Sequence, residues 1–236
     1  VDQTHTLYSS VDSGDTGTWR DKSGSSGIGS RTLAMTGWGC GFIDLENDGG
    51  LDLALVHGRV MRGKVAPGAD CGPFWNEYAE TNQLFLNRGG GKYSMEKTRA
   101  GSFSSHVEVS RGLAFADLDS DGDTDLVQSN LGNGLRVFRN EAQASGNHWL
   151  RVRALTGKRD DLGALVVVSA GGKVLKRPVL SSSSFACASD AAVHFGLGKS
   201  RQVDSISVRW SDGSRELFDT AGVDRLLEVR QGKGRQ

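Results

Sequence analysis

Acidic residues at alternating positions form the same short loop twice in this chain, and their spacing suits a bound cation. Each loop has side-chain oxygens at positions 1, 3, 5 and 9, a backbone carbonyl at position 7, and a glycine that permits a sharp turn after position 5. Carboxylates held so close together need a cation to offset their mutual repulsion. The predicted metal ligands are Asp44, Glu46, Asp48, Gly50 and Asp52 in the first loop, and Asp117, Asp119, Asp121, Asp123 and Asp125 in the second loop.

Calcium is the cation that this ligand set favours. It accepts about six to eight flexible oxygen ligands, whereas magnesium demands a tighter octahedral arrangement. An EF-hand would place a glutamate at position 12, but Leu55 and Gln128 stand there, and the flanking residues are typical of strands. We therefore predict two Ca2+ sites in loops between β-strands. Glu46 makes the first loop the less regular one, and an acidic surface turn that binds nothing is the alternative for either loop alone.

The overall composition indicates a turn-rich β protein. The 236 residues include 33 glycines and only 3 prolines. Because 28 basic residues balance 28 acidic ones, the chain has no net field that would attract nucleic acid or an anionic membrane. No apolar run is long enough to span a bilayer. The chain opens without the pattern of a signal peptide, so we expect a mature or trimmed product.

The acidic loops belong to a longer repeat of four short strands, which is typical of a β-propeller blade. An apolar strand follows each loop, and a second one comes later, at residues 83–87 and 136–140. A third copy of that later strand lies at residues 6–10 and precedes a glycine-rich turn and an aromatic strand. We therefore predict the last two strands of one blade, a complete blade over residues 37–95, and the first three strands of another over residues 111–140.

The strand pattern changes from Asn147 onwards and predicts a second all-β domain. Its strands alternate with turns rich in glycine, serine and aspartate, and helical periodicity is weak throughout the chain. The predicted fold is therefore all-β, with a partial propeller of about two blades, incomplete at both ends, ahead of a small β domain. The domain ranges that we predict are residues 1–145 and 146–236.

An insertion between Gly58 and Thr81 interrupts the complete blade and carries Phe74, Trp75 and Tyr78. Long loops in compact domains are usually functional or disordered. The aromatic residues predict an ordered contact surface, and a loop packed on itself is the alternative.

The three cysteines match no zinc or redox spacing. Cys40 and Cys71 could form a disulfide in an oxidising compartment, which would leave Cys187 free or paired between chains. Buried thiols are the alternative.

Several motifs carry a resemblance to known families. The segment from Asn147 to about Gln231 contains Asn147-His148-Trp149-Leu150, Val193-His194-Phe195-Gly196-Leu197-Gly198 and Val208-Arg209-Trp210-Ser211-Asp212-Gly213. With these motifs the segment resembles the ASPIC/UnbV domain, and the acidic loops resemble the FG-GAP/VCBS repeats of integrin α-chain propellers. Together they are similar to the C-terminal part of cartilage-acidic-protein-like proteins.

The resemblance implies a secreted, extracellular or periplasmic, calcium-binding protein of the adhesion or matrix kind. Members usually carry a full propeller, whereas this chain holds about two blades. Unpaired strands can join another chain by edge pairing. We therefore expect a homo-oligomer or filament, or association with the remainder of a larger propeller, together with a protein or glycan partner that the exposed edges and the aromatic insertion would contact.

No constellation of residues indicates an active site, so the chain is predicted not to be an enzyme. The histidines are scattered, and His194, in an apolar strand, is interpreted as structural. Two alternatives stay open. One is a biosynthetic enzyme or enzyme accessory with calcium as a Lewis acid, and the other is a lectin-like glycan-binding module that uses the tryptophans.

Overall fold

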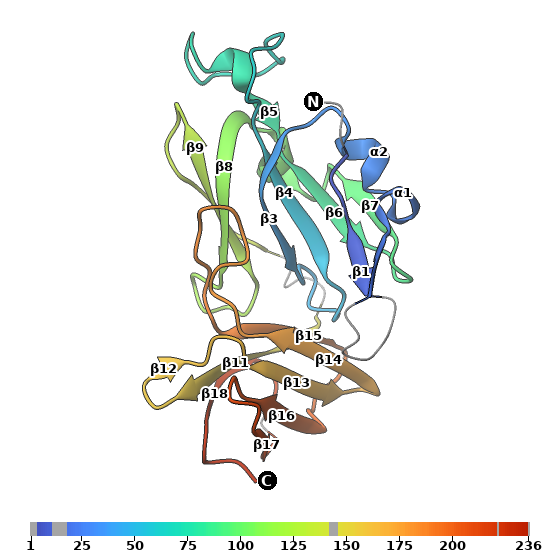
Figure 1. Cartoon of the computed structure of the whole chain (residues 1–236), viewed down its shortest axis with the longest axis vertical. Coiled ribbons are helices and arrows are strands. Elements are labelled where there is room, and N and C mark those ends of the chain that lie inside the picture. The colour runs from blue at the N-terminus through green and yellow to red at the C-terminus, as the bar shows by residue number, and fades with distance from the viewer. Residues whose placement is uncertain (1–3, 11–17, 142–145, 221, 236) are drawn as a thin grey trace.

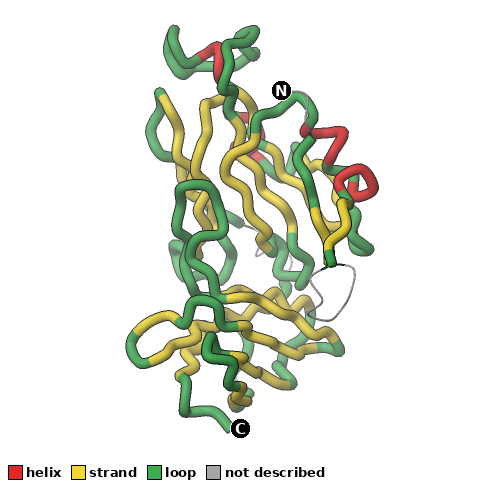
Figure 2. The backbone as a smooth tube through the Cα atoms, viewed as in Figure 1, coloured by secondary structure: helices red, strands yellow, loops and turns green. Residues whose placement is uncertain are grey.

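Two groups of β-sheets make up the molecule (Figure 1). The computed structural model describes residues 4–10, 18–141, 146–220 and 222–235. Figure 2 shows strands throughout both groups, with the few helical turns confined to the N-terminal one. The all-β prediction is thus confirmed. Among the described residues, no helix is long and apolar enough to cross a membrane.

The first sheet is a four-stranded antiparallel sheet in chain order. It contains β3 (Gly37–Ile43), β4 (Asp52–His57), β6 (Gln83–Asn87) and β7 (Tyr93–Glu96). These are the four strands predicted over residues 37–95. Side chains alternate along β4, so that Leu53 and Leu55 join one hydrophobic cluster while Ala54 and Val56 join another. Every residue of β4 is buried because both faces of the sheet are covered.

The second sheet contains the three strands predicted over residues 111–140 and one more. Its strands are β8 (Val107–Ala116), β9 (Asp125–Leu131), β10 (Arg136–Phe138) and β5 (Glu80–Thr81). The short β5, at the end of the insertion, pairs with the start of β8, which the sequence did not predict. Among the described strands β10 pairs only with β9, so its outer edge has no partner strand. The helix α3 (Gly101–Ser105) connects the two sheets and buries Phe103.

An N-terminal hairpin lies beside the first sheet. It consists of β1 (Tyr8–Ser10) and β2 (Trp19–Asp21), followed by the helical turns α1 (Ser23–Ser26) and α2 (Gly29–Thr32). Ile28 packs with Leu53, Leu55 and Phe85 and thereby fastens this segment to the sheet. The first part of the predicted aromatic strand, residues 14–17, lies outside the described residues.

The aromatic insertion projects from the end of the sheets that faces away from the C-terminal strands (Figure 1). It contains the single turn η1 (Asn76–Tyr78). The ring centroids of Phe74 and Trp75 lie 4.9 Å apart, and those of Trp75 and Tyr78 lie 5.8 Å apart. The rings therefore pack on one another, although Phe74 remains 54% exposed.

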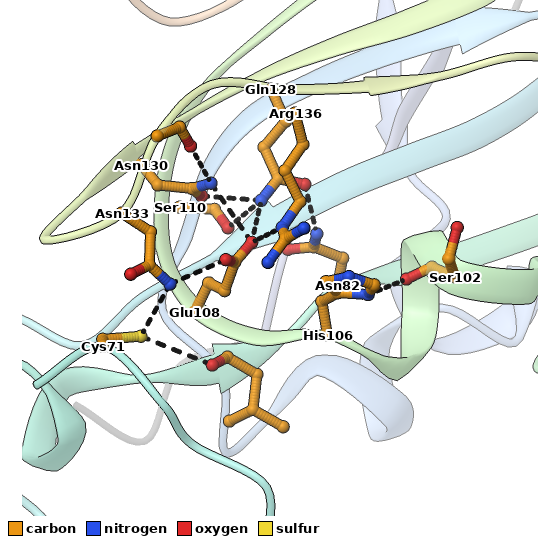
Figure 3. A network of polar contacts seen from close by, with 12 residues as sticks. Cys71, Asn82, Ser102, His106, Glu108, Ser110, Gln128, Asn130, Asn133 and Arg136 are labelled. Atoms are coloured by element: carbon orange, nitrogen blue, oxygen red, sulfur yellow. Dashed lines mark hydrogen bonds and ion pairs between the residues drawn. The ribbon is translucent and has the colours of Figure 1, made fainter.

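A buried carboxylate anchors the base of the insertion (Figure 3). Glu108 on β8 is only 2% exposed and accepts hydrogen bonds from four side chains. Asn133 in turn contacts Sγ of Cys71 at 3.5 Å, which ties the insertion to the second sheet. The four donors are Gln128 at 3.2 Å, Asn130 at 3.1 Å, Asn133 at 2.8 Å and Arg136 at 2.6 Å.

The three cysteines are free thiols. Cys40 packs against the cluster around Phe85, whereas Cys71 is buried against Val107 and Val109. The two residues belong to different clusters, so the disulfide considered between them does not form. The alternative of a buried thiol holds for Cys71.

The C-terminal strands form two sheets that face each other across one hydrophobic core. One sheet contains β11 (His148–Thr156), β12 (Arg159–Asp160), β15 (Val193–Gly198) and β18 (Arg225–Arg230), and the other contains β13 (Leu165–Ala170), β14 (Lys173–Pro178), β16 (Ser205–Arg209) and β17 (Arg215–Phe218). Phe195 and Trp210 are the largest side chains of that core. The first strand, β11, pairs in parallel with the last strand, β18, through six residue pairs. The predicted domain boundary adjoins residues 142–145, outside the described residues, and stays a prediction.

Candidate calcium site

The two acidic loops have the same internal hydrogen bonds. The carboxylate at position 1 accepts bonds from the backbone N–H groups of positions 5 and 6. For Asp44 these bonds come from Asp48 at 3.0 Å and Gly49 at 2.8 Å. For Asp117 they come from Asp121 at 3.1 Å and Gly122 at 3.2 Å. The sequence repeat is therefore also a structural repeat.

The carboxylate at position 9 closes each loop in the same way. Asp52 accepts bonds from the N–H groups of Leu45 at 3.2 Å and Asn87 at 2.7 Å. Asp125 accepts bonds from those of Leu118 at 2.9 Å and Asn140 at 2.8 Å. The carboxylates at positions 1 and 9 thus build the loop as well as offering metal ligands.

The turn in each loop requires positive φ angles. Gly49 and Gly122 have φ angles of 89° and 92°, which confirms the expected role of the glycine after position 5. Asn47 and Ser120, both at position 4, have φ angles of 55° and 63°. The residue types at position 4 did not indicate this backbone conformation.

The second loop brings three predicted ligands together. One carboxylate oxygen from each of Asp117, Asp119 and Asp125 lies within 4.8 Å of the others. Calcium bonds to oxygen at about 2.3–2.6 Å, so one ion can contact all three. Asp121 accepts a bond from the N–H of Asp123, and Arg139 pairs with Asp119 at 2.8 Å. In the part of the chain that the structure describes, this is the only group of three or more such residues.

The first loop does not gather its side chains in this way. Asp44 is only 2% exposed and Asp52 only 4%. Glu46 forms an ion pair with Arg99, and Asp48 accepts a hydrogen bond from the N–H of Gly50 at 2.7 Å. Burial raises the pKa of Asp44 to about 7 and that of Asp52 to about 6, although backbone N–H groups oppose the shift. A cation in this loop would favour the charged form of both groups.

Both loops lie at the end of their sheets that faces the C-terminal strands (Figure 1). The N–H of Gly196 donates to Oδ2 of Asp44 at 3.1 Å, and the N–H of Gly198 donates to the carbonyl oxygen of Asn47 at 2.8 Å. In the second loop, Arg151 donates to Oδ2 of Asp117 at 2.8 Å. The carboxylate at position 1 of each loop therefore contacts the C-terminal sheets.

Asn47 joins three parts of this interface. Its amide nitrogen donates to Oδ1 of Asp123 at 2.6 Å, which connects the two loops. Its amide oxygen lies 2.7 Å from Nε2 of His194 on β15. Sequence reasoning missed Asn47, and also Gly196, where a Cβ atom would overlap Asp44. Only the unusual glycine within an apolar strand pattern could have indicated that close approach.

A second contact comes from residues 181–190, between β14 and β15. Oγ of Ser184 accepts a hydrogen bond from the N–H of Cys40 at 3.2 Å. The ring of Phe185 packs against Trp38 with centroids 4.9 Å apart. This segment lies along β3 and β8 and extends the interface beyond the loops (Figure 1).

We predict that His194 makes the interface sensitive to acid. Burial, together with the charges of Arg151 and Arg177, lowers its pKa from 6.5 to about 3. Below about pH 6.5 the unfolded chain takes up a proton that the folded chain refuses, so the stability contributed by His194 is lost as the pH falls towards 3.

A His194→Gln variant keeps an N–H group for Asn47 but cannot titrate. Urea unfolding between pH 6.5 and pH 3 measures the free energy of unfolding of both proteins. As the pH falls, the parent should lose up to about 1.4 kcal/mol more stability per pH unit than the variant. Equal slopes would contradict the prediction.

The fold and the site define an all-β protein with two acidic loops, one of which could hold a metal ion, set against a C-terminal β domain. Residues 155–236 match the family model described as ASPIC and UnbV. The C-terminal part of the chain thus matches the ASPIC/UnbV domain, as the sequence motifs predicted. The likeness of the acidic loops to FG-GAP/VCBS repeats stays a prediction.

Two relatives are similar to a longer stretch of the chain than the family model is. Cartilage acidic protein 1 of Homo sapiens is 28% identical over 169 residues, which are 66% of this chain and 25% of that protein. Cartilage acidic protein 1 of Xenopus tropicalis is 32% identical over 124 residues, which are 50% of this chain and 19% of that protein. The chain thus spans about a quarter or less of the length of these relatives.

Proposed function

We propose that this chain is part of an extracellular calcium-binding protein of the matrix or adhesion kind, with a structural role instead of a catalytic one. The observation that carries the proposal is the position of the acidic loops, between the blade-like sheets and the ASPIC/UnbV domain. The similarity to proteins named for cartilage and acidity supports an extracellular matrix setting. In this proposal, calcium fixes the C-terminal domain to the sheets.

The residues that would hold the ion are those that also shape the interface. Asp117, Asp119 and Asp125 supply carboxylate oxygens, and the carbonyl at position 7 belongs to Asp123. Calcium would supply positive charge that offsets carboxylate repulsion. Asp117 also pairs with Arg151, so the position of this carboxylate affects both the metal site and the C-terminal domain.

Calorimetric titration with calcium tests the metal sites. We expect two ions in the parent and one in either loop variant, Asp48→Asn or Asp119→Asn. Amide hydrogen exchange tests the docking role, because the N–H groups of Gly196 and Gly198 donate to the first loop. Chelation should speed exchange at these two amides and leave that of Ile206, inside the C-terminal core, unchanged. A parent protein that takes up no calcium would contradict the proposal.

We also propose that the outer edge of β10 mediates self-association. Val137 is 57% exposed, and with Phe138 it borders a pocket of about 750 Å³ that Arg99 and Arg139 also line. An added strand would hydrogen-bond to the edge and place alternate side chains in this pocket. A second copy of the chain adding in this way would produce a head-to-tail contact.

A charged residue at this edge should prevent such pairing. We expect Val137→Lys to weaken self-association by at least about tenfold, since an added strand would have to desolvate the ammonium group. Sedimentation velocity over a concentration series, with calcium present, measures the effect. Leu162→Lys is the matched control, because Leu162 is also 52% exposed but lies outside any strand. Unchanged association of the Val137 variant would exclude this edge as the contact.

A further inference from the structure

Buried polar atoms without hydrogen-bond partners gather at one end of the first sheet, the end opposite to the acidic loops. Five of the twelve such atoms among the described residues belong to three side chains: His5, His57 and Gln83. Oε1 of the nearby Glu80 also lacks a hydrogen bond but lies 3.5 Å from Nε of Arg59. Both ring nitrogens of His5 and of His57 are in this group. Desolvating a polar group without a partner is costly, so such a concentration needs an explanation.

The two imidazole rings face each other. His57 ends β4 and is fully buried, while His5 precedes β1 in the N-terminal segment. Their ring centroids lie 5.3 Å apart with an interplanar angle of 74°. Gly37, which pairs with His57 in the sheet, lies so close to His5 that a Cβ atom there would overlap Nε2. The absence of a side chain at Gly37 therefore makes room for the ring.

Two oxygen-bearing side chains accompany the rings. Leu55 pairs with Gln83, and His57 lies two residues along the same strand, so His57 and Gln83 share one face of the sheet. The amide nitrogen of Gln83 donates to the carbonyl of Arg31 at 2.9 Å, while Oε1 has no partner among the described residues. Glu80 accepts a bond from the N–H of Thr36, next to Gly37, at 3.0 Å.

We propose that His5 and His57 together bind a divalent transition-metal ion of the zinc class, which clamps the N-terminal segment onto the first sheet. With metal–nitrogen bonds of about 2.1 Å and a tetrahedral angle, two bound imidazoles have centroids about 5 Å apart, close to the observed separation. Gln83 Oε1 or water completes the coordination. Imidazole nitrogen favours zinc, copper and nickel over calcium, so this site differs in chemistry from the acidic loops.

The protonation state of both rings agrees with this assignment. Burial, together with the neighbouring His5, lowers the pKa of His57 to about 3, although the backbone of Thr81 partly opposes the shift. Burial also lowers the pKa of His5. Both rings are therefore neutral near pH 7, and neutral imidazole is the form that ligates metals.

Zinc titration of the tag-free chain, with calcium in excess to saturate the acidic loops, tests the proposal. We expect one zinc ion per chain, a higher melting temperature in zinc, and the visible absorption of tetrahedral cobalt when Co2+ replaces zinc. His5→Ala should weaken zinc binding by at least about tenfold, a loss typical even of residues that only support a ligand. His148→Ala is the control, since His148 lies in β11 of the C-terminal sheets and its ring is bonded to Asp224.

His5 is the better target because its backbone lies in the N-terminal segment, whereas loss of the fully buried His57 can disturb the fold. Circular dichroism of each variant checks that it is folded before titration. A parent that binds no zinc, or a folded His5→Ala variant that binds it as tightly as the parent, overturns the proposal. Neither result bears on the calcium loops, which are titrated separately.

Discussion

Chelation of calcium is expected to lower the melting temperature of this protein by several degrees. A ligand that binds only the folded state stabilises it by mass action, by about 2.7 kcal/mol when its concentration is 100 times the dissociation constant. Its removal also leaves Asp117, Asp119 and Asp125 with carboxylate oxygens within 4.8 Å of one another. Differential scanning calorimetry with calcium and with chelator measures the shift.

The Asp119→Asn variant distinguishes calcium binding from ordinary loop stability. Asp117 and Asp125 accept backbone hydrogen bonds that build the loop, whereas the contact that the structure gives for Asp119 is its ion pair with Arg139. In calcium, the variant should have a lower melting temperature than the parent. In chelator, its melting temperature should be no lower than that of the parent, because the substitution relieves the repulsion between carboxylates. An equal decrease in melting temperature in calcium and in chelator would indicate that the variant loses only its ion pair with Arg139.

Asp219→Asn is the matched control for this experiment. Asp219 also pairs with a single arginine, Arg235 at 3.0 Å, but its side chain is 93% exposed and lies far along the chain from either loop. Exposed ion pairs contribute little to stability. The control should therefore melt like the parent in both conditions.

Trp210→Ala is expected to cause the largest loss of stability of any single change considered. Trp210 is 1% exposed and belongs to the core between the two C-terminal sheets. Truncating a buried tryptophan to alanine costs about 3–5 kcal/mol, because it removes apolar contacts and leaves a cavity. Urea unfolding followed by far-ultraviolet circular dichroism measures this loss.

Trp210→Phe separates packing from hydrogen bonding at the same position. The indole Nε1 of Trp210 has no hydrogen-bond partner among the described residues. Phenylalanine keeps an aromatic ring against Phe218 and removes the unpaired N–H group. The Trp210→Phe variant should therefore lose clearly less stability than the Trp210→Ala variant. Equal losses of stability in the two variants would contradict this prediction.

The sheets were predictable because their patterns are local. Residues 37–95 and 111–140 carry strand-length apolar runs between turn signals, and these runs became β3, β4, β6, β8, β9 and β10. The addition of β5 to the second sheet was not predictable, since Glu80 and Thr81 pair with a strand more than twenty residues away and carry no pattern of their own.

The candidate site was predictable only in part, for a similar reason. The spacing of acidic residues identified both loops, because the ligands of one ion lie close together in the sequence. It could not reveal that Asn47 reaches both Asp123 and His194, since those contacts depend on how distant segments pack. Nor could it show that Glu46 pairs with Arg99.

The parallel pairing of β11 with β18 has a mechanical consequence. The chain enters the C-terminal domain at the start of β11, and the end of β18 lies at the other end of this strand pair. After β18 the chain stays on the domain, because Arg235 exchanges backbone hydrogen bonds with Leu217 of β17. Tension along the chain pulls the two strands past each other and loads all six residue pairs, from Leu150–Arg225 to Leu155–Arg230, at the same time. Shear of this kind must break the pairs together, whereas a hairpin pulled at its open end separates one pair after another. The parallel register of β11 and β18 therefore resists tension applied between the start of β11 and the end of β18.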